Sequence, residues 1–206
     1  MKGAPGRPFG FDLSFDGGIH VNVQPTSLPG VFLLEPRVFS DPRGTFFELF
    51  QNKRFADAGL PTTFVQDNVS FSERGTLRGL HLQNPFAQGK LVSVLEGEVF
   101  DVAVDVRVGS PTFGRWVGEL LSSTNHRQLY IPPGFAHGFC VTSARCIFQY
   151  KCTDIYAPSA ELGVIWNDPD LGITWPVEAP LLSAKDERYP RLAEIPPDKL
   201  PRYVAP

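Results

Sequence analysis

The segment from Val99 to Val108 alternates between two kinds of side chain, and this constrains the fold more than any other feature of the chain. One set of alternate positions carries Phe100 and the valines at 102, 104, 106 and 108, and the other set includes Asp101, Asp105 and Arg107. A repeat of two residues is the period of a β-strand, and β-branched residues favour strands. The stretch from Arg145 to Lys151 alternates too, with one face formed by Cys146, Phe148, Tyr150 and the following Cys152. Both segments are predicted to be core strands.

The composition favours short strands joined by tight turns. The 206 residues include 19 glycines, 20 prolines and 17 phenylalanines, which supply many turns and many large apolar anchors. Further strands are expected at residues 31–34, 45–50, 64–71, 115–121, 128–131 and 164–166, turns at 41–44 and 96–97, and one short helix at 53–58. No internal repeat and no helical stretch long enough for a βαβ unit is evident in the sequence. The chain is therefore predicted to be all-β, a closed or two-sheet barrel such as a jelly roll, with a few short helices.

The two ends of the chain differ in character from its middle. Residues 1–27 are rich in glycine, proline and polar residues and show weak periodicity, so we expect an N-terminal extension that is partly mobile. The folded domain is expected over residues 28–190, a length that fits one domain with a substantial core. Residues 191–206 are expected to form a C-terminal tail.

The charge and the cysteine count restrict the partners and the compartment. The net charge is −3 and there is no run of Lys and Arg, so a basic face for nucleic acid is not indicated. We find no apolar run of about 18 residues, which a membrane-spanning helix would need, and the first five residues lack the apolar core of a signal peptide. Three cysteines make an odd count, which favours a reducing compartment. We expect a cytoplasmic protein, with room for a local basic pocket that binds a small anion.

The densest cluster of chemically useful residues lies between Arg78 and Val92. His81 follows Arg78 and Gly79, and Lys90 comes after one short loop. Histidine can take a proton near neutral pH, and the fork of an arginine matches two phosphate oxygens. A lone histidine is more often packed or at the surface, but the neighbouring cations and the position at a barrel mouth favour a site. The cluster suggests proton removal from a phosphorylated substrate.

A second histidine lies in the stretch Ile131–Phe139, where Pro132, Gly134 and His137 follow the spacing Pro-x-Gly-x-x-His. This resembles the second sequence motif of the cupin superfamily. The first cupin motif would supply His-x-His, but here the second histidine is replaced by Gln83. Because a stable metal site usually needs three or four good ligands, we expect no bound metal.

Tyr150 and Asp186 are ambiguous by themselves. Tyr150 lies on a face that should turn inward, where the simplest interpretation is core packing with a satisfied hydroxyl. Asp186 is a turn aspartate by default, and no local spacing links it to His81.

Taken together, the segments resemble the family of dTDP-4-dehydrorhamnose 3,5-epimerases over roughly Thr26 to Asp186. The matching segments lie at residues 42–44, 46–48, 66–68, 77–81, 88–92, 97–102, 110–114, 134–139, 150–151, 165–168 and 182–186. The family often has a histidine after Gln-Asp-Asn, where this chain has Val69, and the first 25 or so residues have no counterpart in it. So many matches in order make the resemblance specific.

The resemblance implies a cupin that works without a metal or redox cofactor, as a homodimer with sheets shared between the subunits. The implied substrate is a dTDP-4-keto-6-deoxy sugar, whose C3 and C5 protons His81 would remove. Asp186 would pair with His81, Tyr150 would return a proton on the opposite face, and Lys90 would stabilise the enolate oxygen. The nucleotide and sugar would be bound by Arg43, Glu48, Gln66, Asp67, Asn68, Arg78, His137, Glu161 and Lys185. The resemblance also allows Arg43 to reach in from the partner subunit.

Three other functions remain open at this point. A related enzyme could epimerise only C3 or only C5 with the same base, although the presence of both Tyr150 and Lys90 favours the double reaction. A metal-dependent cupin oxygenase is disfavoured by Gln83. A non-catalytic sugar-binding cupin would not need His81, Asp186 and Tyr150 together.

Overall fold

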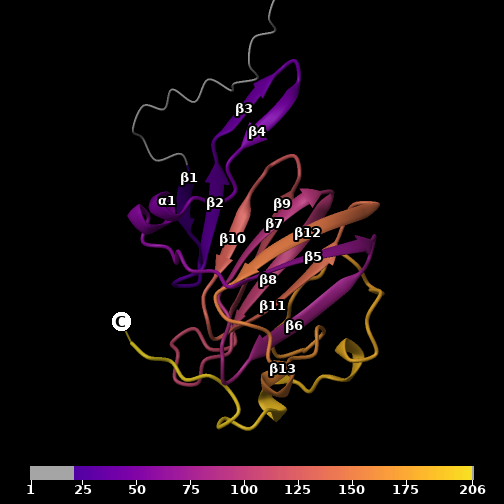
Figure 1. Cartoon of the computed structure of the whole chain (residues 1–206). Coiled ribbons are helices and arrows are strands. Elements are labelled where there is room, and N and C mark those ends of the chain that lie inside the picture. Colours follow the sequence, from indigo (N-terminus) through magenta and orange to yellow (C-terminus); the bar gives the residue numbers. More distant parts are fainter. Residues whose placement is uncertain (1–20, 206) are drawn as a thin grey trace, which may run out of the picture.

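The computed structural model describes residues 21–205, which form two antiparallel β-sheets that pack face to face (Figure 1). The larger sheet has six strands in the order β1 (Val21–Pro25), β2 (Phe32–Pro36), β10 (Gln128–Ile131), β7 (Lys90–Glu96), β12 (Arg145–Cys152) and β5 (Gln66–Glu73). The smaller has five, in the order β13 (Glu161–Gly163), β6 (Leu77–Gln83), β11 (Phe135–Val141), β8 (Glu98–Asp105) and β9 (Trp116–Ser122). The predicted all-β jelly roll of the cupin type is confirmed.

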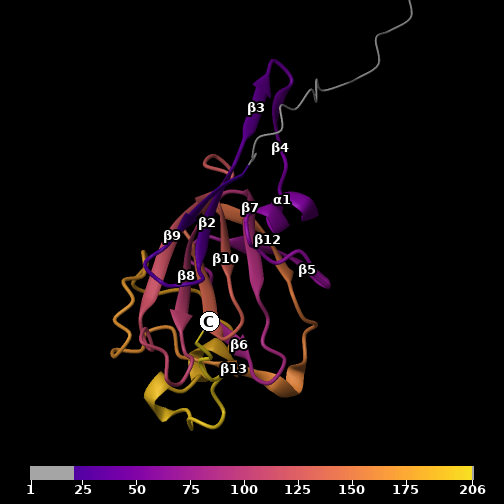
Figure 2. The same cartoon turned by 90° about the vertical axis from the view of Figure 1, so that its left-hand side faces the viewer.

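The remaining elements are short. A separate hairpin of β3 (Val38–Asp41) and β4 (Gly44–Phe47) projects beyond the two sheets, as Figures 1 and 2 show from two directions. The helices are α1 (Asn52–Asp57) and the 3-10 turns η1 (Pro158–Ala160), η2 (Asp186–Arg188) and η3 (Leu192–Glu194). Among residues 21–205, no helix is long and apolar enough to span a membrane.

The main core lies between the sheets and combines side chains from both. Phe148 of the larger sheet and Phe139 of the smaller are buried there with stacked rings, whose centroids lie 4.1 Å apart. Full burial of one such side chain contributes about 1.5–3 kcal/mol. The expected inward face of β12, from Cys146 to Cys152, is confirmed.

Both faces of strand β8 are covered by other parts of the protein, rather than one face being exposed to solvent. Val102 and Val104 turn away from the larger sheet, into a second buried cluster with Leu192, Ile195 and Leu200 from the end of the chain. Asp101 and Asp105, on the opposite face, are completely buried. The strand ends at Asp105 rather than Val108, because the Asp105 carboxylate accepts hydrogen bonds from Arg107, Ser110 and Thr112 and so closes a turn.

The turn expected at Glu96–Gly97 is present and requires glycine. Gly97 has a φ of +83°, and a Cβ there would lie 2.1 Å from the Arg145 carbonyl oxygen. A side chain could not occupy that space. The turn therefore joins β7 of one sheet to β8 of the other.

Several expected boundaries differ from the structure. β1 lies inside the segment that we expected to be an extension, because Val21 to Pro25 pair with β2; residues 1–20 lie outside the described residues. The expected tail contributes Leu192, Ile195 and Leu200 to the second buried cluster, so it packs as part of the domain. In place of the strand expected at 164–166, β13 begins three residues earlier, at Glu161. Val164 lies just beyond it and still exchanges two backbone hydrogen bonds with Leu80. Residues 48–50 lie beyond the end of β4.

Candidate active site

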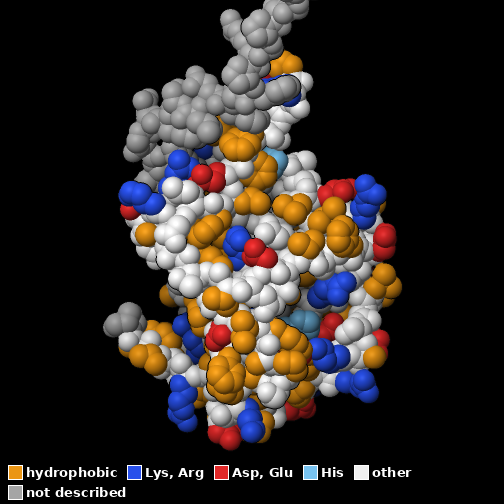
Figure 3. All heavy atoms as spheres, viewed as in Figure 1, with side chains coloured by type: hydrophobic (Ala, Val, Ile, Leu, Met, Phe, Trp, Pro, Cys, Tyr) orange, Lys and Arg blue, Asp and Glu red, His pale blue; other side chains and the backbone are white. Residues whose placement is uncertain are grey.

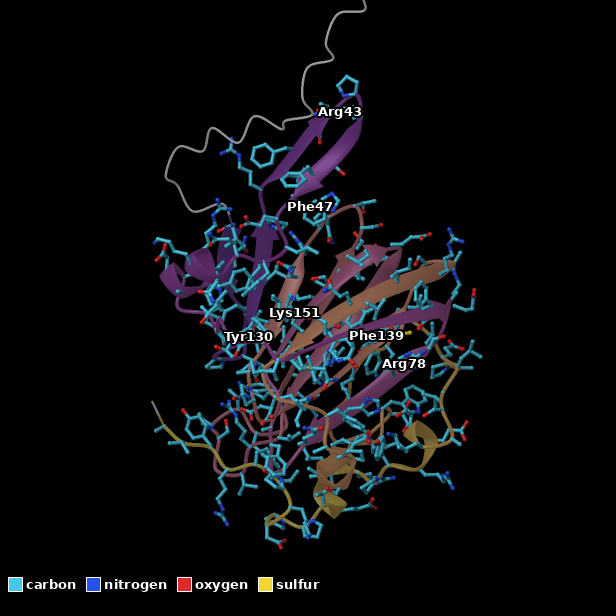
Figure 4. All side chains as sticks on the ribbon, in the orientation of Figure 1. Arg43, Phe47, Arg78, Tyr130, Phe139 and Lys151 are labelled. Atoms are coloured by element: carbon cyan, nitrogen blue, oxygen red, sulfur yellow. The ribbon has the colours of Figure 1, made fainter. Side chains whose placement is uncertain are left out.

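Two adjoining cavities open between the sheets, at the end where the polar inward-facing side chains gather. One has a volume of about 490 Å³ and is lined by Ser70, Arg78, His81, Lys90, His137, Phe139, Tyr150, Ser183, Lys185 and Asp186. The other, of about 310 Å³, is lined by Gln66, Asn68, His81, Leu82, Gln83, Gln88, Lys90, Tyr150, Tyr156, Glu161 and Lys185. Both include His81, Lys90, Tyr150 and Lys185, so we treat them as one site. Figure 4 shows Arg78 and Phe139 close together, on the paired strands β6 and β11.

His81 and Asp186 form a close pair across 105 residues of sequence. His81 Nε2 lies 2.6 Å from Asp186 Oδ1, and the backbone N–H of Asp186 donates to the Ser183 hydroxyl. Burial alone would raise the pKa of Asp186, but the hydrogen bonds from His81 and Ser183 outweigh burial and hold this pKa below its usual value. Asp186 is thus ionised at neutral pH and can stabilise a protonated His81 ring.

Lys90 enters the site from the first residue of β7 and is buried. Burial lowers the pKa of its ammonium group, and nearby Cys152, Asp101 and Glu161 only partly offset this. Among residues 21–205, no carboxylate lies within salt-bridge distance of the Lys90 ammonium. A buried cation in this state is available to an oxyanion that enters the cavity.

Tyr150 lies on β12, in the sheet that faces His81. Tyr150 lines the cavity and also packs against the main core, and burial raises the pKa of its phenol. Tyr150 therefore remains protonated at neutral pH and can donate a proton. Because His81 comes from the five-stranded sheet and Tyr150 from the six-stranded sheet, the two side chains approach the cavity from opposite walls.

A second His–Asp pair lies deeper. His137 Nε2 lies 3.1 and 3.0 Å from the two carboxylate oxygens of Asp101, and both residues are buried. Burial lowers the pKa of His137, Lys90 and His81 lower it further, and Asp101 opposes them. Our sequence analysis missed Asp101, which the alternation of β8 assigned only to the face opposite the valines.

The rim of the site is organised around Glu161. Its carboxylate accepts hydrogen bonds from Tyr156 at 2.6 Å, Lys185 at 2.5 Å and Tyr189 at 3.2 Å. Burial would raise the pKa of Glu161, but the hydrogen bonds from Lys185 and Tyr156 outweigh it and the pKa is lowered. Tyr156 and Tyr189 are not in the motifs that we singled out, and no spacing in the sequence links them to Glu161.

On the adjoining wall, the Gln66 amide donates to the Asn68 side chain and its oxygen accepts the backbone N–H of Tyr156. Arg78 donates to the Ser72 hydroxyl. Predicted residues Gln66, Asn68 and Arg78 thus line the site.

Three predicted site residues lie elsewhere in this chain. Asp67 pairs with Lys151 at 2.9 Å on the outer face of β5, because successive side chains of a strand point to opposite faces; its assignment to the site is therefore not supported by the structure. Arg43 lies at the tip of the projecting hairpin (Figure 4), where it pairs with Asp41. Glu48 pairs with Arg54 near the base of that hairpin.

Gln83, at the position of the missing metal ligand, joins loops instead. Its amide nitrogen donates to the carbonyls of Phe86 and Ile155, and its oxygen accepts the backbone N–H of Ala157. Among residues 21–205, no three His, Cys, Asp or Glu side chains are grouped so that they could hold a metal ion. The side chains at this position therefore do not fit the metal site of a metal-dependent cupin.

The comparisons with known proteins agree on one family. The family model described as dTDP-4-dehydrorhamnose 3,5-epimerase matches residues 25–194. The dTDP-4-dehydrorhamnose 3,5-epimerase of Pseudomonas aeruginosa is 58% identical over 170 residues, which cover 82% of this chain and 94% of the relative. A dTDP-4-dehydrorhamnose 3-epimerase of Streptomyces niveus is 42% identical over 176 residues, which cover 84% of this chain and 85% of the relative.

A solved structure shows the same likeness in three dimensions. The dTDP-6-deoxy-D-glucose-3,5-epimerase of Legionella pneumophila, in complex with dTDP-4-keto-L-rhamnose, superimposes with a TM-score of 0.88 at 53% identity, covering 90% of this chain and 100% of that one. The chain therefore belongs to the dTDP-4-dehydrorhamnose 3,5-epimerase family, and it is an isomerase.

Proposed function

We propose that the protein epimerises dTDP-4-dehydro-6-deoxy-D-glucose at C3 and C5 to give dTDP-4-dehydro-L-rhamnose, a step of dTDP-L-rhamnose biosynthesis. The observation that carries the proposal is the placement of His81 and Tyr150 on facing sheets. Inversion at carbon needs a base on one side of the sugar and an acid on the other. A site with both groups on one wall could not do this.

His81 is the proposed base. The C4 ketone acidifies the hydrogens on the two neighbouring carbons, so that a neutral imidazole can remove them in turn. The imidazolium that forms is stabilised by the ionised Asp186 carboxylate at 2.6 Å. Asp186 also fixes the orientation of the ring, and with it the nitrogen that faces the substrate.

Lys90 and Tyr150 complete the proposed chemistry. Removal of the proton places negative charge on the C4 oxygen, and Lys90, a buried cation with no carboxylate partner among the described residues, is the group to stabilise it. Tyr150, protonated at neutral pH, delivers a proton to the opposite face of the enolate. At each carbon a C–H bond breaks as its proton passes to His81, and a new C–H bond forms with a proton from Tyr150; carbon is neither oxidised nor reduced overall, so the reaction requires no redox cofactor.

The remaining residues are proposed to bind the substrate. Arg78 offers its guanidinium to a phosphate, because among residues 21–205 it donates only to the neutral Ser72 hydroxyl. The polar groups of Gln66, Asn68, His137, Glu161 and Lys185 surround the space for the sugar and nucleotide.

A homodimer would supply the residues that this chain leaves outside its own cavity. The projecting hairpin carries Arg43, and its length beyond the sheets suits a partner subunit. The outer face of the larger sheet exposes Val69, Phe71 and Leu95, and apolar side chains gather over β5 and β12 in Figure 3. An exposed apolar face of this kind is typical of an interface. The three buried, unpaired cysteines support a cytoplasmic location.

The decisive experiment is proton NMR of dTDP-4-keto-6-deoxy-D-glucose incubated with the purified protein in D2O. Loss of the C3 and C5 proton signals is the expected result, because each enolate takes its new proton from Tyr150, whose hydroxyl exchanges with the D2O. Exchange at one carbon only would identify a single-site epimerase, like the one named in Streptomyces niveus. No exchange at either carbon would refute the catalytic proposal and leave a sugar-binding role.

A further inference from the structure

Tyr189 lies beside the His81–Asp186 pair but has no role in the chemistry described above. The ring centroids of Tyr189 and His81 are 5.7 Å apart and the planes are inclined by 67°, an edge-to-face contact. The Tyr189 hydroxyl donates to Glu161 Oε1. One aromatic side chain therefore touches the proposed base and the carboxylate that organises the rim.

The ring of Tyr189 rests directly on the backbone of β13. Gly163 is the residue of β13 that pairs with His81 of β6. A Cβ on Gly163 would lie 2.4–2.5 Å from three atoms of the Tyr189 ring, a distance that non-bonded carbon atoms do not reach. Because Gly163 has no side chain, it leaves the space that the Tyr189 ring occupies.

The segment that carries Asp186 needs such a support. η2 has only three residues, and a single 3-10 turn has no stability of its own. Inside the segment, the N–H groups of Glu187 and Arg188 donate to the carbonyls of Ser183 and Lys185. These local bonds shape the turn. Before Asp186, the Lys185–Glu161 ion pair and the backbone hydrogen bond from Leu77 of β6 to Leu181 tie the segment to the sheet. After Asp186, the ring of Tyr189 on Gly163 is the side chain that supports it beside His81.

We propose that Tyr189 is a positioning residue for the His81–Asp186 pair, with its ring seated on Gly163 as the spacer between η2 and β6. This inference rests on the proposed function only in taking His81 of the pair to be the catalytic base. Without the ring, Asp186 would move away from His81, and the His81 ring would lose the carboxylate that favours its charged form.

The test uses Tyr189→Leu, which removes the ring, beside Tyr189→Phe, which keeps the ring and removes only the hydroxyl. Tyr203→Leu is the matched control, because Tyr203 packs against Arg107 away from the cavity. For each variant, kcat and KM are measured against pH, and the ring carbon signals of His81 are titrated by NMR.

For Tyr189→Leu we expect kcat to fall about 10–100-fold with KM within about twofold, and the acid limb of the kcat profile to move to lower pH. The NMR titration of His81 should move in the same direction. Tyr189→Phe and Tyr203→Leu should keep the wild-type acid limb. Gly163→Ala, which displaces the ring while keeping Tyr189, should reproduce the shift and serves if Tyr189→Leu does not fold.

A wild-type acid limb and wild-type His81 titration in both Tyr189→Leu and Gly163→Ala would overturn the proposal. A lower kcat with both profiles unchanged would also overturn it, because that is the signature of general damage to the fold. If the wild-type protein showed no epimerase activity, the proposed function would fail, but a shifted His81 titration in Tyr189→Leu would still support the positioning role.

Discussion

The site contains two His–Asp pairs that are alike in composition and different in setting. His81 and His137 are direct partners on the neighbouring strands β6 and β11, and their ring nitrogens lie 2.6 and 3.0 Å from a carboxylate oxygen. The side chain of His81 is 29% exposed, whereas that of His137 is 7% exposed. Asp101 is held in the strand β8, while Asp186 comes from a short turn.

Both histidines line the cavity, and this difference indicates that the degree of exposure, rather than the pairing itself, separates the proposed base from the largely buried His137. Burial lowers the pKa of His137 and keeps its ring neutral, with Lys90 adding to the effect. His81 has the carboxylate and also the open space into which a substrate can bring a proton. A sequence motif that contains a histidine cannot distinguish these two states.

The largest expected effect separates the two histidines directly. We expect His81→Asn to reduce turnover to background, because general base catalysis contributes about 10²–10⁴-fold, while the protein still folds and binds dTDP. His137→Asn should retain measurable turnover. Proton exchange in D2O measures the first property and calorimetry with dTDP the second. If His137→Asn also lost all turnover while its dTDP binding stayed intact, the distinction between the two pairs would be wrong.

Lys90→Met should have the next largest effect. We expect kcat to fall about 10²–10³-fold, the usual loss when an oxyanion-stabilising donor is removed. The thermal stability should be unchanged or higher, because the variant replaces a buried cation with an apolar side chain of similar length. Steady-state kinetics and a thermal melt check both parts. A lower Tm with a normal kcat would make Lys90 a structural residue.

Tyr150→Phe should have a smaller effect that differs between the two carbons. We expect exchange at C3 or C5 to slow by about 10–100-fold and the other to slow less, because the acid cannot be equally placed for both. Separate integration of the two proton signals against time gives the answer. Equal and negligible effects at both carbons would remove Tyr150 from the mechanism.

The smallest effect concerns stability rather than turnover. The pKa of His137 is lower in the folded state than its unfolded value of about 6.5, so this neutral histidine contributes stability above that pH and the contribution is lost as the pH falls below it. The groups that face it are Asp101, Lys90 and His81. We expect the free energy of unfolding of the wild type to fall more between pH 7.5 and 5 than that of His137→Gln, by at most about 1.4 kcal/mol per pH unit, and the Tm to drop more accordingly. Parallel drops in both proteins would contradict this.

Much of the fold could be predicted from periodicity. The side chains of β8 and β12 alternate in character because successive residues of a strand point to opposite faces of its sheet. The direction in which β8 faces could not be predicted in this way. Val102 and Val104 turn outward, whereas Asp101 and Asp105 turn inward, because the end of the chain covers the outer face. A pattern of alternating residues identifies two faces but not what covers each one.

The site was predictable where its residues are close in sequence or match a family motif. His81 and Lys90 lie nine positions apart on adjoining segments, so local reasoning brought them together. Asp186 is joined to His81 only by the fold, and the resemblance alone suggested it. Asp67 was included with its neighbours Gln66 and Asn68, and the pleat of β5 placed it on the other face.

Gln83 sets a limit on how this chain could change its chemistry. A single base change converts a glutamine codon to a histidine codon, which would restore the His-x-His of metal-binding cupins at one stroke. The same change would remove the three hydrogen bonds through which Gln83 joins the loops at Phe86, Ile155 and Ala157. The evolutionary route from this scaffold to a metal enzyme is short in mutational steps, and it is obstructed by loop architecture rather than by the genetic code.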